Sequence, residues 1–496
     1  MWGTVPTMGD CALVFFCLMG LMKAKYLILL LLLVGFSTAF AAVDVNDIYI
    51  QGDSTLMGMK IESSYFAENA FLIETTGARF EYVKGQLKIY QGLDKTNRRL
   101  LSTVTFDNEP NFIKVKASDD HILLWSKDLN LGIYGNSTLI VSPKNKQQLK
   151  CRGNFKPDYE GRYKGELLLI DDLGGMEIYP QRYEAGYKIK KIELGKQDWI
   201  ADYELKAGER VMIAAFPGRE FDWEKSFRMN IIGTGGRATA EIYPDGELPP
   251  DAVIREWSRK FDVMYVSYGS LYKESAPGGP YMLKNKAEFE RLVRTAHRNG
   301  MKVVAYSSLF YHYRRTRDIE SYYEEMKLLH DKYAIDGLYV DGLLFDQEPY
   351  WIDDKIVNFE MMRRLRRLFG SEGLIFYHGT SLGSPVATIP NVDSYCDVTV
   401  YGEGVAFRSV KDPYVRYQVR KYGISNTIGI WLTDNNPNSI GYAEIVDAVI
   451  EMNCREWWGD ATFNQKFNAR FRYYLKRFGI LKKAYLTDKQ HFIQTR

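Results

Sequence analysis

From about residue 250 onward, short apolar segments alternate with amphipathic segments that carry the period of a helix. The apolar segments are Phe261–Tyr268, Met301–Leu309, Ile335–Leu343, Leu374–His378, Cys396–Tyr401 and Thr427–Leu432. The amphipathic segments are Lys284–Arg298, Asp318–Tyr333 and Asp354–Phe369. Nearly continuous apolar strands that alternate with helices are typical of a parallel sheet covered by helices.

This order of segments favours a (β/α)8-type (TIM) barrel over a doubly wound sheet. The first strand is followed by Ser267-Tyr268-Gly269-Ser270, which is not the G-x-G-x-x-G loop of a dinucleotide-binding fold. Cys454–Trp458 supplies a seventh strand, and the sequence shows no eighth, so an incomplete barrel stays open as an alternative. We expect the barrel domain to span residues 249–496.

The preceding region, residues 42–248, is predicted to form a β-sandwich. Its sequence consists of short alternating runs that are separated by Gly, Asn and Asp, and it shows no long helical period. Phe80–Tyr82 and Leu87–Tyr90 flank Lys84-Gly85-Gln86, which is the signature of a hairpin.

Residues 1–41 have the features of a targeting leader. Lys23 and Lys25 precede the apolar run Tyr26–Phe36, and Ala39-Phe40-Ala41 fits a signal-peptidase site. We expect a secreted or periplasmic protein. The alternative is an uncleaved membrane anchor, helped by the apolar stretch Cys11–Leu21, and the leader is the only membrane contact that we expect.

Composition and motifs exclude several classes of function. The chain has 65 Lys and Arg against 62 Asp and Glu among its 496 residues, so no excess of basic residues favours a nucleic-acid partner. Cys151, Cys396 and Cys454 lack the paired spacing of a zinc site. The sequence contains no P-loop, H-E-x-x-H, G-x-S-x-G or C-x-x-C motif. We expect neither a metal nor a cofactor.

Two acidic residues are the candidate catalytic pair. Function collects at the carboxyl ends of the strands in a parallel barrel. Asp341 ends an apolar strand, and Glu403 follows Val398–Gly402. The alternative for Asp341 is a helix cap or a loop ion pair. Asp336 precedes the same strand as Asp341, at its opposite end, and is interpreted as structural.

Further polar and aromatic residues near strand ends are candidates for substrate binding. Sugar rings pack on aromatic faces while their hydroxyl groups bond to polar side chains, although aromatic residues also suit the boundary between core and solvent. The candidates are His378, Asp346, His312, Tyr268, Tyr401, Trp431 and Asp434. Tyr306, Tyr339 and Tyr377 also lie near strand ends.

At these residues the chain resembles glycoside-hydrolase-like proteins, in particular uncharacterised bacterial members of the α-galactosidase and α-glucosidase superfamily. The resemblance rests on Asp341 with Asp346, on His378, and on Tyr401-Gly402-Glu403, and it covers roughly residues 254–460. It implies a β-sandwich followed by a barrel that acts on a carbohydrate. One departure is Gly342, where the pattern has a second acid.

The sequence therefore predicts a glycoside hydrolase that uses two carboxylates, with Asp341 as nucleophile or base and Glu403 as acid. The first alternative is a non-catalytic carbohydrate-binding protein on a degenerate barrel, favoured by the missing eighth strand and by Gly342. The second alternative is a structural or partner-binding surface protein.

Overall fold

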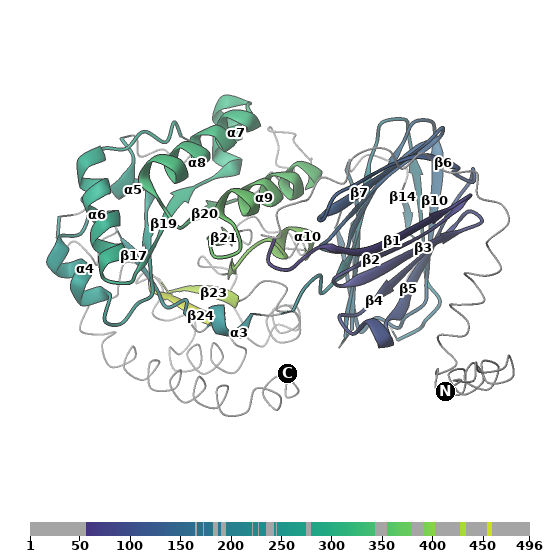
Figure 1. The fold of residues 1–496 in the computed structure, drawn as a ribbon, viewed down its shortest axis with the longest axis horizontal. Coiled ribbons are helices and arrows are strands. Elements are labelled where there is room, and N and C mark those ends of the chain that lie inside the picture. Colours follow the sequence, from purple (N-terminus) through teal and green to yellow (C-terminus); the bar gives the residue numbers. More distant parts are fainter. Residues whose placement is uncertain are drawn as a thin grey trace, which may run out of the picture.

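The computed structural model of the chain describes residues 56–163, 166–171, 173–181, 187–189, 195–220, 222–226, 228–234, 243–244, 246–273, 279–342, 355–378, 390–401, 427–432 and 454–458. Two antiparallel sheets come first in the sequence, and a barrel of parallel strands follows them (Figure 1). The leader lies outside the described residues, so its cleavage and the secretion of the protein stay predictions.

The first sheet of the sandwich has eight strands. In spatial order they are β1 (Ile61–Ala67), β2 (Ala70–Thr75), β3 (Ala78–Val83), β4 (Gln86–Gln91), β5 (Arg99–Phe106), β10 (Gln147–Gly153), β15 (Ile200–Leu205) and β14 (Tyr187–Ile189). The short helix η1 (Lys95–Asn97) joins β4 to β5. In β10 buried and exposed residues alternate strictly, which shows that this strand turns one face to the core.

The second sheet also has eight strands. In spatial order they are β11 (Tyr159–Tyr163), β12 (Glu166–Asp171), β13 (Gly174–Pro180), β16 (Val211–Phe216), β9 (Thr138–Pro143), β8 (Leu129–Tyr134), β7 (His121–Ser126) and β6 (Phe112–Ala117). Side chains from both sheets, such as Phe80 and Ile89 from the first and Ile178 and Ile213 from the second, form one buried apolar cluster.

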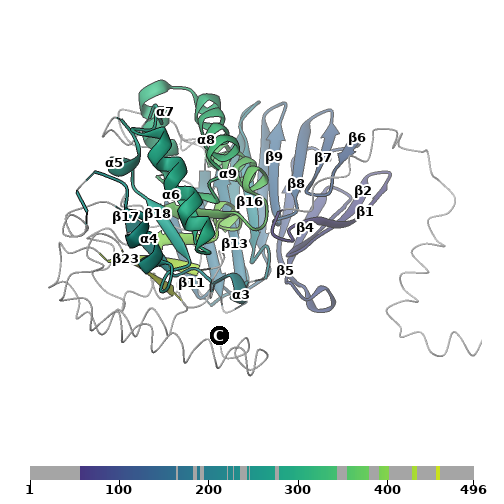
Figure 2. The ribbon, with the colours of Figure 1, turned by 60° about the vertical axis from the view of Figure 1, so that its left-hand side comes forward.

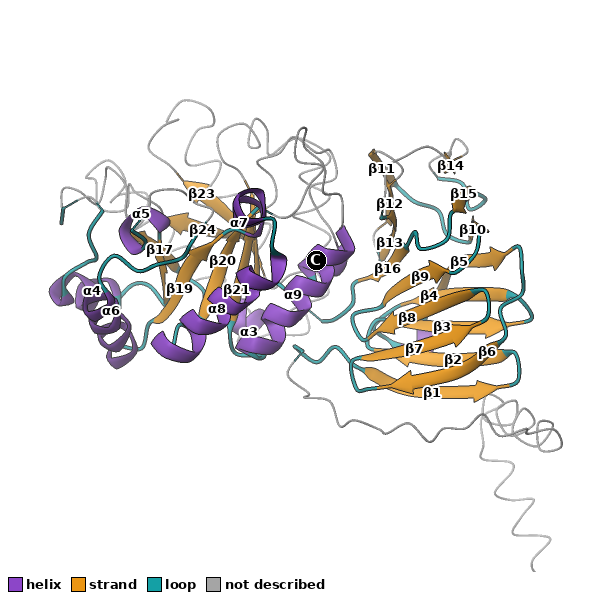
Figure 3. Ribbon diagram, turned by 90° about the horizontal axis from the view of Figure 1, so that it is seen from above, coloured by secondary structure: helices purple, strands orange, loops and turns teal. Residues whose placement is uncertain are grey.

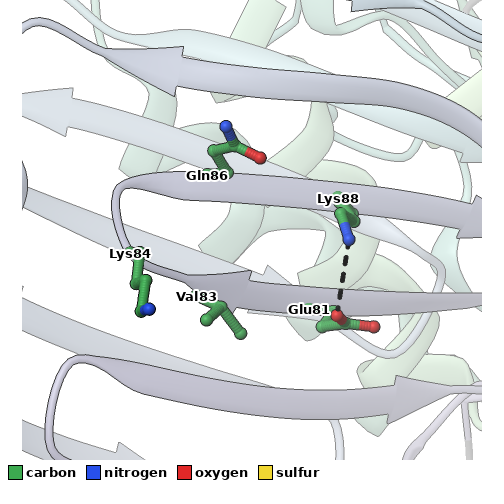
Figure 4. Close-up of a pocket in the computed structure, with 5 residues that line it drawn as sticks. All are labelled: Glu81, Val83, Lys84, Gln86 and Lys88. Carbon is green, nitrogen blue, oxygen red and sulfur yellow. Dashed lines mark ion pairs between the residues drawn. The ribbon is translucent and has the colours of Figure 1, made fainter.

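The predicted hairpin is confirmed by the pairing of β3 with β4, in which Val83 lies opposite Gln86. The two turn residues, Lys84 and Gly85, have φ angles of 47° and 76°. Two successive positive φ values are the requirement of a two-residue type I′ turn, whose twist matches that of the flanking strands. Figure 4 shows this hairpin.

The barrel is closed and consists of eight parallel strands, all within the described residues. They are β17 (Ile231–Thr234), β18 (Val263–Val266), β19 (Lys302–Ser307), β20 (Gly337–Asp341), β21 (Leu374–His378), β22 (Val398–Tyr401), β23 (Thr427–Leu432) and β24 (Cys454–Trp458). The closure is made by β17, which pairs with β18 on one side and with β24 on the other.

Strand β17 is the eighth strand that the sequence did not reveal, and it lies before the predicted domain start at residue 249. The barrel therefore begins inside the region that was assigned to the sandwich. The reason is the length of the strand: Ile231 to Thr234 form only four residues, and so short an apolar run gives no period by which to distinguish it from the sandwich strands before it.

Helices lie on the outside of the barrel (Figures 2 and 3). Their bounds are α3 (Trp223–Ser226), α4 (Asp251–Trp257), α5 (Tyr268–Leu271), α6 (Lys286–Arg298), α7 (Leu309–Thr316), α8 (Ile319–Tyr333), α9 (Lys355–Phe369) and α10 (Pro390–Asp393). The side chains of Asn285, Ser308 and Asp318 cap α6, α7 and α8 by accepting backbone N–H groups of the first turn. None of the helices among the described residues has the length and apolarity to cross a membrane.

Three aspartates join neighbouring barrel strands at their amino ends. Asp262, Asp336 and Asp397 each stand just before a strand and accept a backbone N–H from the start of the preceding strand. The donors are Asn230 at 3.0 Å, Val303 at 2.7 Å and Ile375 at 2.7 Å, in that order. Asp336 thus lies at the end of β20 opposite Asp341, as its structural interpretation requires.

The sandwich packs directly against the barrel through its second sheet. Ile140, Tyr179 and Met212 belong to the same buried apolar cluster as the barrel residues, and α10 contacts β16. Every residue of β13 and of β16 is buried. A sheet that is covered on both faces has strands that are apolar throughout, which accounts for the continuous run Val211–Phe216.

Candidate active site

Asp341 and His378 end adjacent parallel strands and lie opposite each other in the β20–β21 register. Because parallel strands run in the same direction, their carboxyl ends meet at one edge of the barrel. Nδ1 of His378 is 3.3 Å from Oδ1 of Asp341. The Asp341 side chain keeps 24% of its surface exposed, whereas that of His378 keeps 2%. The structure therefore brings two predicted site residues together and leaves the carboxylate accessible.

Tyrosine hydroxyl groups hold both members of this pair. Tyr306 donates a hydrogen bond of 2.7 Å from its hydroxyl to Oδ2 of Asp341. The hydroxyl of Tyr339 lies 2.8 Å from Nδ1 of His378. The carboxylate beside Nδ1 favours the tautomer that carries its proton on that nitrogen. Each oxygen of Asp341 thus faces a polar hydrogen.

Burial is the main reason why Tyr306 stays a neutral donor. It raises the pKa of Tyr306 well above 10.0, and the nearby charge of Asp341 raises it further. An ionised carboxylate only accepts hydrogen bonds. The proton between the two groups therefore stays on the phenol, and Asp341 is held in its charged form.

The site has a wall of tyrosine rings. The ring centroids of Tyr306 lie 5.1 Å from Tyr268 and 5.8 Å from Tyr339, and Tyr265 lies 5.0 Å from Tyr339. Tyr268 is 38% exposed while the other three are buried. Tyr268, a predicted substrate contact, is thus the accessible member of a cluster that reaches Asp341 through Tyr306.

The backbone around Asp341 is fixed by the start of α7 and by β21. Ser308 donates from its hydroxyl to the Asp341 carbonyl, and the N–H of Gly342 donates to the His378 carbonyl at 2.9 Å. Gly342 has a φ of +77°, and a Cβ there would lie 3.1 Å from Cβ of Phe310. A side chain at this position would be strained and crowded. Glycine therefore follows Asp341 for a conformational reason.

His312 lies in a different cluster. Its side chain is buried in α7, it stacks on Tyr281 with a centroid distance of 5.7 Å, and its Nε2 is 2.8 Å from the Ser321 hydroxyl. Burial lowers its pKa. The contacts that the structure gives His312 are not with Asp341 or His378, and its role as a substrate contact stays a prediction.

Five predicted site residues are not described in side-chain detail. Glu403, Asp346 and Asp434 lie outside the described residues. Tyr401 ends β22 and Trp431 lies in β23, so the structure places their backbones in the barrel but says nothing of their side chains. The catalytic role of Glu403 and the binding roles of the other four stay predictions.

Tyr306 and Tyr339 are the site residues that sequence reasoning did not select. Both lie near strand ends, which the sequence shows, but their partners depend on the register. Tyr306 lies opposite Tyr339 in the β19–β20 pairing, and Asp341 follows Tyr339 by two residues on the same face of the strand. Alternation along the strands was the available signal, and the pairing of β19 with β20 was the missing information.

Other features of the described residues do not compete with this site. A shallow hollow lined by Glu81, Val83, Lys84, Gln86 and Lys88 lies on the sandwich hairpin (Figure 4). Its charged members form a cross-strand pair, with Nζ of Lys88 3.8 Å from Oε1 of Glu81. Within the part of the chain that the structure describes, no group of three or more His, Cys, Asp and Glu residues is arranged to hold a metal ion.

No family model matches the sequence, and neither does any curated protein. Solved structures do match it. A GH36 α-galactosidase from Geobacillus stearothermophilus in complex with stachyose is 10% identical, with 85% of this chain and 86% of that chain covered and a TM-score of 0.44. A GH31 dextranase from Flavobacterium johnsoniae complexed with glucose is 10% identical, with 86% and 69% covered and a TM-score of 0.41. An uncharacterized Listeria monocytogenes protein in complex with glucose is 7% identical, with 85% and 54% covered and a TM-score of 0.41.

Proposed function

We propose that this protein is a glycoside hydrolase in which Asp341 is the charged carboxylate and Glu403 is the second acid. The observation that carries the proposal is the environment of Asp341. It stands at the carboxyl end of a barrel strand, it is partly exposed, and Tyr306 and His378 hold its two oxygens. A carboxylate that is fixed and charged suits the nucleophile or base of a glycosidase.

Hydrogen bonds to the ionised form of a carboxyl group favour that form over the neutral acid. Asp341 is therefore suited to attack the anomeric carbon, to stabilise the positive charge that develops there, or to activate a water. The proton that the leaving group needs must come from another acid, and Glu403 is our candidate for it. The exposed ring of Tyr268 offers a face on which a sugar ring can pack.

Two sequence arguments for a non-catalytic protein lose their force. The eighth strand, which the sequence did not reveal, is β17, and it closes the barrel. The glycine after Asp341 has a positive φ and a close neighbour in Phe310, so its presence does not indicate a lost acid. The catalytic reading therefore has more support than the non-catalytic alternative.

The test is a screen for sugar release from a panel of polysaccharides and aryl glycosides, with the wild type, Asp341→Asn and Glu403→Gln. Asp336→Asn is the matched control, because Asp336 stands at the opposite end of the strand that carries Asp341. We expect release by the wild type and the control and none by the two site variants, with circular dichroism showing that all four are folded. Glycan binding without release by the wild type would instead support the non-catalytic alternative.

A further inference from the structure

The orientation of the Asp341 carboxylate depends on two contacts of unequal quality. The Tyr306 bond to Oδ2 is 2.7 Å long, the usual length for a hydroxyl donor, whereas the 3.3 Å between Nδ1 of His378 and Oδ1 exceeds the usual range for a nitrogen donor. The terminal torsion of an aspartate is broad, so the side chain itself does not fix the plane of the carboxylate. Tyr306 is therefore the main restraint.

Tyr306 is itself held in place before any substrate arrives. Its ring is only 2% exposed and lies against the rings of Tyr268 and Tyr339. Its carbonyl accepts a hydrogen bond of 2.7 Å from the hydroxyl of Tyr272. A donor that is rigid in the free protein needs no rearrangement during the reaction, which is the condition under which positioning accelerates a chemical step.

The two restraints come from opposite sides of β20. Tyr306 belongs to β19 and His378 to β21, and both strands pair with β20. The carboxylate is thus held between its two neighbouring strands, with its remaining exposed surface toward solvent. Loss of the Tyr306 hydroxyl would leave only the longer contact on one side.

We propose that Tyr306 is a positioning residue that fixes the plane of the Asp341 carboxylate for catalysis through the hydrogen bond from its hydroxyl to Oδ2. The inference rests on the proposed function, since it assigns Tyr306 a role through Asp341. Tyr306 does not need to touch the substrate for this role. Tyr268, whose ring covers one side of Tyr306, lies between it and the solvent-exposed part of the tyrosine wall.

The test compares the full-length wild type with Tyr306→Phe, which removes the hydroxyl and keeps the ring. Tyr82→Phe is the matched control, because the buried hydroxyl of Tyr82 donates to the Pro110 carbonyl at 2.8 Å in the sandwich. On an aryl glycoside that the wild type cleaves, we expect kcat of Tyr306→Phe to fall by about 10- to 100-fold, the effect of one lost hydrogen bond to a charged group. We expect KM to change by no more than about two-fold.

Two further readouts separate positioning from a loss of stability. The acid limb of the pH profile of kcat/KM should move to higher pH in Tyr306→Phe, because the hydroxyl donates to the ionised carboxylate and not to the acid. Crystal structures of the wild type and Tyr306→Phe should show one orientation of the Asp341 carboxylate in the first and a rotated or divided one in the second. Tyr82→Phe should lose stability without either change.

An unchanged carboxylate orientation in Tyr306→Phe would overturn the inference, as would a wild-type kcat with an unshifted acid limb. The structural comparison does not require turnover. If the wild type released no sugar from any substrate, the proposed function would fail, and the orientation of Asp341 in the two structures would still decide whether Tyr306 holds it.

Discussion

The guanidinium of Arg366 and the carboxylate of Asp397 form an ion pair in which neither side chain is exposed to solvent. Asp397 also accepts the N–H of Ile375 and lies 2.7 Å from Nζ of Lys225. Burial by itself would raise the pKa of Asp397, but Arg366 and Lys225 outweigh it and hold the pKa at about 2. The pair joins α9 to the start of β22 and connects both to α3.

We expect Asp397→Asn to lower the free energy of unfolding by about 3–5 kcal/mol, because removal of one partner leaves buried cations uncompensated. Urea unfolding measures the change. Asp262→Asn is the matched control: Asp262 occupies the equivalent place before β18, where it accepts N–H groups from the backbone and side chain of Asn230. An equal loss in both variants would show that the buried charges do not matter.

A second prediction concerns the ion cluster between the two domains. Asp120 in the sandwich is 4% exposed in its side chain and lies within 2.7 Å of nitrogens of Arg363 and Arg367 on α9. Asp120→Asn should cost about 3–5 kcal/mol of stability and loosen the domain contact, since the two arginines lose a buried partner. Calorimetry should show the single unfolding transition broaden or divide.

Glu360→Gln is the control for that experiment. Glu360 also pairs across the domain contact, with Oε1 3.5 Å from Nη1 of Arg210, but its side chain is 46% exposed. Exposed ion pairs contribute about 0–1 kcal/mol, so we expect a small change and an unaltered transition. A large effect in Glu360→Gln and none in Asp120→Asn would contradict the prediction.

The third prediction is a pH dependence of stability. Nε2 of His297 lies 2.8 Å from Oδ2 of Asp336, and this hydrogen bond raises the pKa of His297 above 6.5. A raised pKa means that the folded state binds the proton more tightly than the unfolded state. The pair therefore stabilises the fold fully below pH 6.5 and loses this contribution as the pH rises through the raised value.

His297→Gln should consequently lower stability more at pH 5.5 than at pH 8.5. Urea unfolding of both proteins at the two pH values gives the comparison, and His330→Gln serves as the control because His330 lies on the exposed side of α8 beside Asp331. A difference between wild type and His297→Gln that is the same at both pH values would rule out the linkage.

The fourth prediction concerns the glycine after Asp341. Gly342→Ala should destabilise the protein by about 1–3 kcal/mol, because its φ of +77° disfavours a side chain. It should also lower kcat, since the new Cβ presses on Phe310 and shifts Asp341. Gly370→Ala is the control: its φ is +65°, but no atom lies within 4 Å of the added Cβ. We expect a loss of stability there with kcat unchanged.

Local sequence pattern predicted much of the barrel. Thr427–Leu432 and Cys454–Trp458 have the bounds that the sequence indicated, because buried parallel strands are apolar throughout and end abruptly. Helix bounds were predicted within a few residues, because Asn285 and Asp318 cap their helices with side-chain oxygens. The sequence could not assign β17, whose four residues become a barrel strand only through pairing with β18 and β24.

The sequence by itself determined that Asp341 and His378 would lie at one edge of a parallel sheet, since both follow apolar strands and parallel strands share that edge. Only the tertiary structure decided that Tyr306 holds Asp341, that Tyr339 holds His378, and that His312 lies in a separate cluster. The physical reason is that strand order, register and barrel closure arise from contacts between residues far apart in the chain. A periodic pattern states which face a residue occupies, and it does not state which neighbour it meets.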